Sequence, residues 1–167
     1  MWAPWRIGYV TGERPSGCVF CHKIESDDDD ANHVLYRGEQ NAVLLNSYPY
    51  NSGHLMVVPN LHVAMLEELS PETSAELWQL TGLCARALKE VLYWEGLNIG
   101  MNLGQVAGAG ISDHLHMHVV PRWNGDTNYM TAVAETRVVP QSLDDSYRQL
   151  KPVFDALAGQ AGGGPPA

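Results

Sequence analysis

Three histidines alternate with apolar residues in one short segment, and no other feature constrains the fold as strongly. The segment 114–120 reads His-Leu-His-Met-His-Val-Val and is followed by Pro121. Alternate side chains of a β-strand lie on the same face, so the three imidazoles would share one face, about 6.6 Å apart in succession. The apolar residues between them would pack against a helix. We therefore expect a strand over 114–120 that ends at Pro121 and separates a polar, working face from a buried one.

Three interpretations of these histidines are open. They could be ordinary structural or solvent-facing residues, a His-x-His pair could bind one zinc ion, or one neutral imidazole could attack the phosphorus of a nucleotide. The glycine-rich loop 103–112 lies just upstream. Small residues such as Gly108 and Gly110 let backbone N–H groups approach phosphate oxygens, which favours the third interpretation.

The remaining elements indicate an α+β fold with an antiparallel sheet. Apolar runs predict strands at 34–36, 42–45, 54–58 and 97–102. The clearest helix follows Ser70, a favourable N-cap before Pro71, and its apolar stripe continues to Val91 before Gly96 ends it. A C-terminal helix is expected over 142–158. Strands, one long helix and strands again are typical of the α+β class.

The 167 residues fit one domain. We place this domain at residues 1–158, and its irregular N-terminal arm at 1–17. A short helix over 18–26 and an acidic loop over 27–32 follow the arm. The tail, 159–167, is rich in glycine and proline and is expected to be disordered.

Charge and hydropathy exclude some classes of function. Ten Lys and Arg against 19 Asp and Glu give a net charge of −9, which argues against general binding to nucleic acid or to anionic membranes. No run of about 18 apolar residues is present, and the N-terminus lacks the apolar core of a signal peptide. We expect a cytoplasmic protein, in which Arg6, Arg122 and Arg137 are candidate counter-charges for an anionic ligand.

The cysteines indicate a metal or redox site rather than a disulfide framework. Cys18 and Cys21 have the two-residue spacing of a zinc knuckle. Two reduced cysteines in a small core or a redox pair are the alternatives, although no thioredoxin-like βαβ pattern surrounds them. Cys84 lies on the apolar stripe of the long helix and is expected in the core. His22 and His33 lie near the acidic loop, and we assign them no role.

Several segments together resemble one known superfamily. Segment 114–120 is similar to the His-φ-His-φ-His-φ-φ signature of the histidine triad superfamily, and segment 46–59 resembles its upstream region. The Trp-Ala-Pro-Trp-Arg start (2–6) and segment 120–128 are closer to bacterial diadenosine tetraphosphate phosphorylases, over about residues 1–155. The resemblance implies a histidine triad fold: an antiparallel sheet with one long and one C-terminal helix, in a homodimer.

The resemblance also implies roles for individual residues. His116 would be the nucleophile that forms a nucleotidyl-histidine intermediate, and His118 would contact phosphate and support the leaving group. No catalytic metal is then required. The implied substrate-binding residues are His54 beside the polyphosphate, Asn102 at phosphate, Asn46 at the ribose and Leu44 in the purine pocket. Asn46 could instead cap a strand end and His54 could be structural, whereas Leu44 is a core residue in either case.

The loop before the triad departs from the superfamily pattern. Segment 107–113 is one residue longer than usual between Asn102 and His114, and Gly110 falls near a position that usually carries a phosphate-binding hydroxyl. Backbone N–H groups at Gly108 and Gly110, or the Ser112 hydroxyl, could make that contact. A roomier loop would suit inorganic phosphate as the acceptor.

By the same resemblance, Cys18 and Cys21 would bind zinc together with His62 and His114. Such a closed four-coordinate site is structural and would hold the N-terminal arm against the catalytic strand. The implied reaction converts diadenosine tetraphosphate and phosphate to ADP and ATP. A histidine triad hydrolase acting on dinucleotides or nucleoside phosphoramidates, or a zinc-containing nucleotide-binding module with little turnover, is the alternative.

Overall fold

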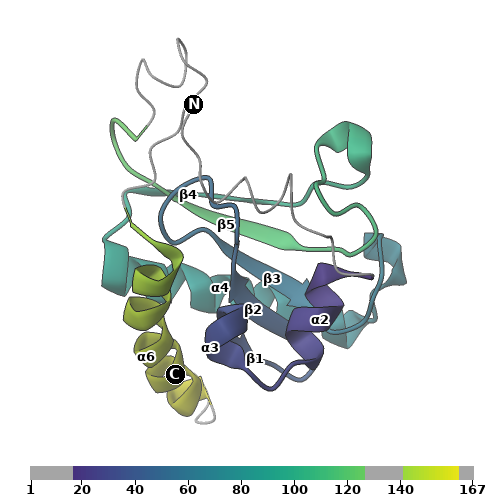
Figure 1. Cartoon of the computed structure of the whole chain (residues 1–167), viewed down its shortest axis with the longest axis horizontal. Coiled ribbons are helices and arrows are strands. Elements are labelled where there is room, and N and C mark those ends of the chain that lie inside the picture. The colour runs from purple at the N-terminus through teal and green to yellow at the C-terminus, as the bar shows by residue number, and fades with distance from the viewer. Residues whose placement is uncertain (1–16, 127–140, 162–167) are drawn as a thin grey trace.

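The computed structural model describes residues 17–126 and 141–161. It contains one five-stranded antiparallel sheet and helices on both of its faces (Figure 1), so the expected α+β class is confirmed. The strand order is β1-β2-β3-β5-β4, with bounds β1 Val34–Arg37, β2 Asn41–Leu45, β3 Leu55–Pro59, β4 Gly96–Gly100 and β5 Met117–Arg122. The counter-charge candidates Arg6 and Arg137, most of the N-terminal arm and residues 162–167 lie outside the described residues.

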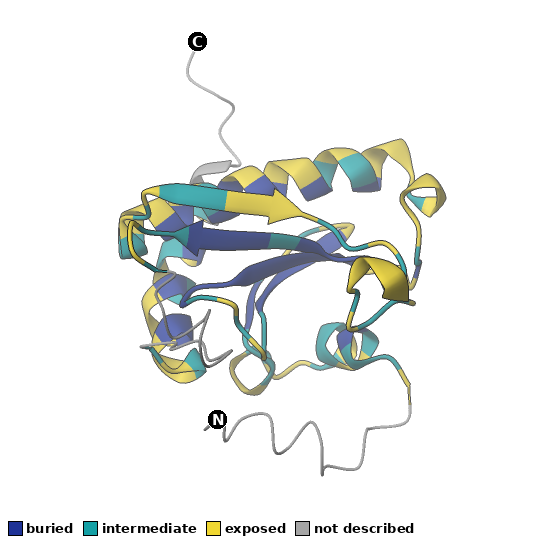
Figure 2. Ribbon diagram, turned by 90° about the horizontal axis from the view of Figure 1, so that it is seen from above, coloured by how far each residue is buried: buried dark blue, intermediate teal, exposed yellow. Residues whose placement is uncertain are grey.

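The helices divide the sheet into two faces. Helix α4 (Pro71–Leu92) packs against β2, β3 and β5, and α6 (Leu143–Ala161) packs against α4 and β1. The short helix α2 (Val19–Glu25) lies on the opposite face, as the view in Figure 2 shows. The smaller elements are α3 (Asp29–Asn32), η1 (Leu66–Glu68) and η2 (Gln105–Ala107). None of the described helices is long and apolar enough to cross a membrane.

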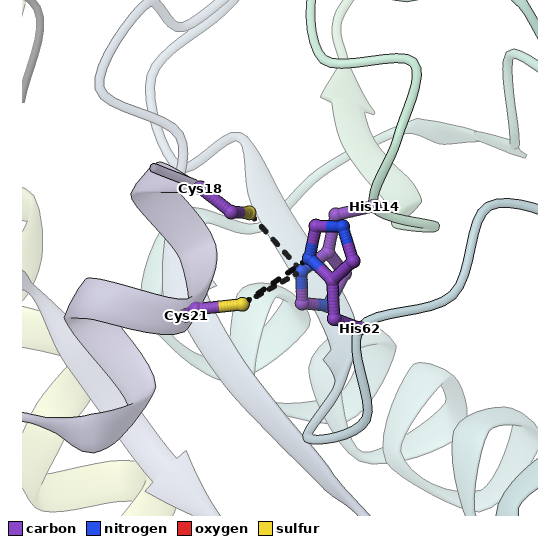
Figure 3. Close-up of side chains that lie close together, drawn as sticks. All are labelled: Cys18, Cys21, His62 and His114. Atoms are coloured by element: carbon purple, nitrogen blue, oxygen red, sulfur yellow. Dashed lines mark hydrogen bonds between the residues drawn. The ribbon is translucent and has the colours of Figure 1, made fainter. Parts of the chain in front are cut away.

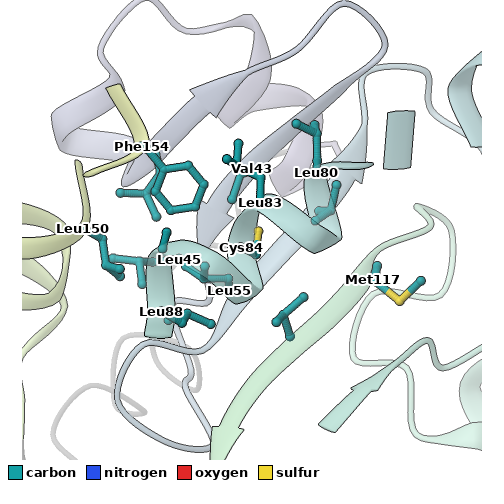
Figure 4. Close-up of a cluster of buried hydrophobic side chains, with 14 of the residues drawn as sticks. Val43, Leu45, Leu55, Leu80, Leu83, Cys84, Leu88, Met117, Leu150 and Phe154 are labelled. Carbon is teal, nitrogen blue, oxygen red and sulfur yellow. The ribbon is translucent and has the colours of Figure 1, made fainter. Parts of the chain in front are cut away.

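Alternation along the strands divides the core between these faces. Val43 and Leu45 of β2 join the large cluster under α4 and α6, which includes Cys84 and Phe154 (Figure 4). Leu44, between them, points to the other face, where it packs with Phe20 of α2 and with Met56. Because β2 has a helix on each face, all five of its residues are buried, which explains its continuous apolar run.

Two helix boundaries differ from the sequence prediction. Helix α4 ends at Leu92 because Tyr93 adopts a left-handed conformation (φ 51°), and Gly96 instead begins β4 beside Arg122. The C-terminal helix continues to Ala161, past the expected end at 158.

The acidic loop expected over 27–32 contains a single helical turn, α3. The Asp28 side chain caps this turn by accepting a hydrogen bond from the Ala31 N–H at 3.0 Å.

The histidine strand begins later and ends later than expected. β5 starts at Met117, so His114 and His116 precede the strand rather than belonging to it. Pro121 does not end β5, because it pairs with Leu97 of β4 beyond the last residue pair with β3. The expected alternation nevertheless holds, since Met117 and Val119 enter the core under α4. The strands predicted over 54–58 and 97–102 are observed at Leu55–Pro59 and Gly96–Gly100.

Candidate active site and metal cluster

Three histidines meet on the sheet face opposite α4. The β3/β5 register pairs Met56 with His118, and His54 lies two residues before Met56 on the same face. The His116 and His118 ring centroids are 4.8 Å apart, and those of His118 and His54 are 5.1 Å apart. The fold therefore brings together three of the histidines that the sequence singled out.

One hydrogen bond decides which ring nitrogen of His116 keeps its lone pair. Its Nδ1 lies 2.8 Å from the backbone oxygen of His114. A carbonyl can only accept, so Nδ1 carries the proton and Nε2 keeps its lone pair. Burial lowers the pKa of His116, which favours this neutral form. His116 thus combines a fixed tautomer with an available nitrogen nucleophile.

A second series of hydrogen bonds orients His118. The Tyr50 N–H donates to His54 Nδ1 at 3.1 Å, so the proton of neutral His54 is on Nε2. This Nε2 lies 2.9 Å from His118 Nδ1, which must then accept. The remaining nitrogen, His118 Nε2, is therefore an N–H donor. Burial, with a smaller contribution from His116, lowers the pKa of His118 to about 4, so the ring is neutral near pH 7.

The turn between β2 and β3 holds His54. Gly53 has a φ of +75°, and a Cβ there would lie 2.4 Å from Leu92 Cδ1 and 3.0 Å from Leu88 Cδ2 of α4. The left-handed conformation favours glycine, and any larger residue would require the Leu92 side chain to move. Asn46 follows β2 and caps its end, because its Oδ1 accepts the Tyr48 N–H at 2.9 Å. Its Nδ2 lies 3.3 Å from His54 Nδ1, so Asn46 also borders the site.

The glycine-rich loop is open. Gly108 has a φ of +92°, which favours glycine, while a Cβ at Gly108 or Gly110 would meet nothing within 4 Å. Asn102 and Ser112 are half-buried on either side of η2. Leu44, by contrast, is fully buried on the same sheet face as His118, because it pairs with Met56, which in turn pairs with His118.

A cluster of four residues that could bind a metal ion, called the metal cluster below, lies at the other end of the triad. The donor atoms of Cys18, Cys21, His62 and His114 all lie within 4.8 Å of one another (Figure 3). The cysteines come from the start of α2, His62 follows β3, and His114 precedes β5. The four residues named from the resemblance thus form one cluster across long gaps in the sequence.

Three donor distances in this cluster are close to those around a tetrahedral zinc ion. His114 Nδ1 lies 3.2 Å from Cys18 Sγ and 3.6 Å from Cys21 Sγ, and His62 Nδ1 lies 3.3 Å from Cys21 Sγ. Zinc with ordinary bond lengths separates its ligand atoms by about 3.3–3.8 Å. His114 Nε2 donates to the Pro59 carbonyl at 2.9 Å, which leaves the Nδ1 lone pair facing the thiols.

The sequence did not identify two aromatic residues at the site. Phe20, between the two cysteines, has its ring centroid 5.5 Å from that of His114 and 5.0 Å from that of His116. Tyr50 lies beside His54 and His118, with centroids 4.7 Å and 5.9 Å away. In the sequence, the only indication of such a role is that Phe20 lies within the Cys-x-x-Cys motif and that Tyr50 lies in the turn before His54.

Two charged residues have structural partners. The Arg122 guanidinium, an expected counter-charge, forms a bidentate pair with Asp126 at 2.6 and 2.7 Å and also donates to Asn98. His33, to which no role was assigned, lies 2.9 Å from Asp144 and connects the end of α3 to α6. Hydrogen bonding to His33 lowers the pKa of the Asp144 carboxyl.

Comparison with known proteins identifies similar chains. The family model described as the HIT domain matches residues 28–125. An AP-4-A phosphorylase of Mycobacterium tuberculosis is 41% identical over 159 residues, covering 90% of this chain and 81% of that protein. The matched range of the family model contains every candidate site histidine and neither cysteine of the metal cluster.

Two solved structures share the fold. A Zn-bound histidine triad family protein from Mycobacterium smegmatis has a TM-score of 0.69 at 30% identity, covering 86% of this chain and 96% of that one. A hypothetical histidine triad nucleotide-binding protein from Sulfolobus tokodaii also has a TM-score of 0.69, at 27% identity, covering 90% and 100%.

Proposed function

The chain belongs to the HIT domain family, and from that premise we propose that it cleaves dinucleoside polyphosphates at the α-phosphorus, with diadenosine tetraphosphate as substrate and inorganic phosphate as acceptor. The observation that carries the proposal is the tautomer arrangement. His116 presents a lone pair at Nε2, while the neighbouring His118 presents an N–H at Nε2. One imidazole is thus prepared to attack phosphorus, and the other to donate to the departing oxygen.

The reaction proceeds in two displacements. His116 Nε2 attacks the α-phosphorus, the bond to the bridging oxygen breaks, and ATP leaves as His118 donates a hydrogen bond to that oxygen. His116 keeps its Nδ1 proton and becomes cationic, and the His114 carbonyl stabilises this charge. An oxygen of inorganic phosphate then attacks the same phosphorus, the P–N bond breaks, and neutral His116 and ADP are released.

We assign the remaining substrate contacts from the site geometry and the resemblance. Leu44 lines the purine pocket, Asn46 contacts the ribose and His54 lies beside the polyphosphate, because all three border the histidine face. Asn102, Ser112 and the backbone N–H groups of Gly108 and Gly110 hold phosphate oxygens. The open conformation of this loop leaves room for the acceptor.

Zinc is the metal we propose for the Cys18, Cys21, His62 and His114 cluster. Two thiolates and two imidazoles suit zinc, and a similar chain of known structure is described as Zn-bound. When bound, zinc would have four protein ligands and would therefore cross-link these segments without binding substrate. His114 then holds the start of β5 in place through its own ring, and the Pro59 carbonyl fixes that ring.

We also propose a homodimer in the cytoplasm. β4 is an edge strand of the sheet, and Ile99 on it is 44% exposed. An unpaired edge with an exposed apolar side chain is suited to pairing with a second copy. The free thiols of the cluster favour a reducing compartment.

Product analysis tests the proposed reaction. Purified protein is incubated with diadenosine tetraphosphate with and without inorganic phosphate, and the nucleotides are separated. ADP and ATP that form only with phosphate are the expected products. If AMP and ATP form whether or not phosphate is present, the acceptor is water and the protein is a hydrolase rather than a phosphorylase.

The His116→Ala variant is the control. It should bind nucleotide and form no product. Wild-type protein that binds nucleotide without turning it over would contradict the enzyme assignment.

A further inference from the structure

Tyr50 has an aromatic ring that contacts the site without belonging to the core. Its side chain is 42% exposed, yet its ring centroid lies 4.7 Å from that of His54 and 5.9 Å from that of His118. The ring planes are tilted by 43° and 31°. An exposed tyrosine that packs on two site imidazoles contributes little to the burial of the main core.

The turn holds this ring in a defined place. The Tyr50 N–H donates to His54 Nδ1, so the backbone of Tyr50 is tied to the histidine on which its ring packs. His54 is fully buried, and Gly53 anchors the turn against α4. The ring therefore lies beside both imidazoles that share the hydrogen bond between His54 Nε2 and His118 Nδ1, and it is itself partly exposed to solvent.

We propose that Tyr50 is a positioning residue, whose ring holds the His54–His118 pair so that the His118 Nε2–H points at the leaving oxygen. The proposal rests on the proposed nucleotidyl transfer. A hydrogen bond that water reaches less easily is stronger and better defined than an exposed one. The Tyr50 ring, which packs on both imidazoles, also limits how far either of them can rotate. Tyr50 acts through His118 and need not touch the reacting atoms.

This role has a consequence that a general loss of structure would not produce. A displaced donor matters most when the leaving oxygen is strongly basic, because such an oxygen needs the most help to depart. Removing the Tyr50 ring should therefore make the reaction rate depend more steeply on the acidity of the leaving group. Attack by His116 is left intact, since its orientation comes from the His114 carbonyl.

The test uses aryl esters of AMP whose phenols span a range of acidity. Phenol release is measured for wild type, Tyr50→Ala and Tyr50→Phe. Tyr50→Ala is expected to lose about tenfold in kcat/KM on the nitrophenyl ester and about a hundredfold on the unsubstituted phenyl ester, because kcat/KM reports the displacement in which the phenol leaves. Tyr50→Phe keeps the ring and should keep the wild-type dependence.

The matched control is Tyr48→Ala. Tyr48 has a similar exposure, 37%, on the same turn, and within the described chain the ring contacts of His54 and His118 involve Tyr50 and not Tyr48. It should behave as wild type on every ester. An equal loss on all esters in Tyr50→Ala, or no loss, would overturn the proposal.

A second measurement separates this proposal from the proposed function. Nitrogen-15 and carbon-13 NMR relaxation of the imidazoles reports how far the His118 ring moves. The backbone N–H of residue 50 keeps the Nε2–H tautomer in all variants, but the His118 ring should be ordered in wild type and Tyr50→Phe and more mobile in Tyr50→Ala. Wild type that releases no phenol from any ester would contradict nucleotidyl transfer, while an equally ordered His118 ring in Tyr50→Ala would contradict the positioning role alone.

Discussion

At the scale of single residues, the direction of each hydrogen bond decides what each imidazole can do. Backbone groups set these directions at both ends: the His114 carbonyl accepts from His116, and the Tyr50 N–H donates to His54. Neighbouring histidines thereby acquire opposite hydrogen-bonding roles, and the hydrogen bonds described between them involve no carboxylate. The low pKa of His118 keeps the arrangement neutral at physiological pH.

The pKa of His118 makes stability depend on pH. Its folded value, about 4, lies below the unfolded value of about 6.5, so the unfolded chain binds more protons between these pH values. The contribution of neutral His118 to stability is thus complete above about pH 6.5 and is lost as the pH falls toward 4. Urea unfolding at pH 7.5, 6 and 5 should show this decline. His118→Gln should reduce it, and an equal slope in the variant would show that His118 titrates normally.

At the scale of elements, two connections place the side chains of the proposed active site. The β2–β3 turn places His54 because Gly53 packs directly against the end of α4. The proposed zinc site would tie the start of α2 and the segment after β3 to His114, two residues before the proposed nucleophile. Phe20 of α2 then packs against both His114 and His116.

Gly53→Ala should destabilise the fold and the site together. The added Cβ overlaps Leu92 and requires a left-handed alanine, a combined cost of about 2–4 kcal/mol in the free energy of unfolding. The measurement is the urea midpoint together with activity. Gly82→Ala is the control, because an added Cβ in the exposed middle of α4 meets nothing within 4 Å and should stabilise by about 0.5–1 kcal/mol. If Gly53→Ala leaves the urea midpoint unchanged, Gly53 does not pack closely against α4.

Removing zinc from the proposed site should destabilise the packing of α2 against the sheet and lower the Tm. Zinc present at a thousand times its dissociation constant adds about 4 kcal/mol to the stability of the folded state. A chelator should therefore lower the Tm of wild type but not of Cys21→Ser, which has lost one ligand. Metal analysis should find one zinc per wild-type chain. Cys84→Ala, a core variant outside the cluster, should keep its zinc, and a zinc-free wild type would contradict the assignment.

The element boundaries show why sequence reasoning succeeded only in part. The alternation around His116 identified the two faces correctly, because side-chain periodicity is local. It could not place the start of β5 at Met117, since pairing with β3 and β4 decides where that strand begins. The end of α4 depends on the left-handed Tyr93 rather than on Gly96. Tyr50 was missed because its contact with His118 joins residues that are far apart in the chain.

At the scale of the whole molecule, the sheet lies between the large hydrophobic core on one face and the proposed active site on the other. The large core lies on the side of α4 and α6, and the histidines and the metal cluster lie on the other. A net charge of −9 means that substrate phosphates meet a protein of the same overall sign, so local N–H donors must supply the attraction. The edge strand β4 leaves one side of the sheet for pairing.

Charge placed on this edge should prevent dimer formation. Ile99→Lys puts an ammonium group where a second β4 would approach, and burying it there is unfavourable. Sedimentation should give a dimer for wild type and a monomer for Ile99→Lys. Val106→Lys, on the exposed η2, should remain dimeric. A wild-type monomer, or a dimeric Ile99→Lys, would exclude the β4 interface.

The central claim is that His116 carries the nucleotidyl group. The most direct measurement is mass spectrometry of the protein mixed with diadenosine tetraphosphate in the absence of phosphate and quenched in alkaline denaturant, where a P–N bond survives. We predict one AMP attached to the peptide containing His116, its release as ADP when phosphate is added before the quench, and no adduct in His116→Ala. An adduct on another residue, or turnover of the substrate by His116→Ala, would contradict the account.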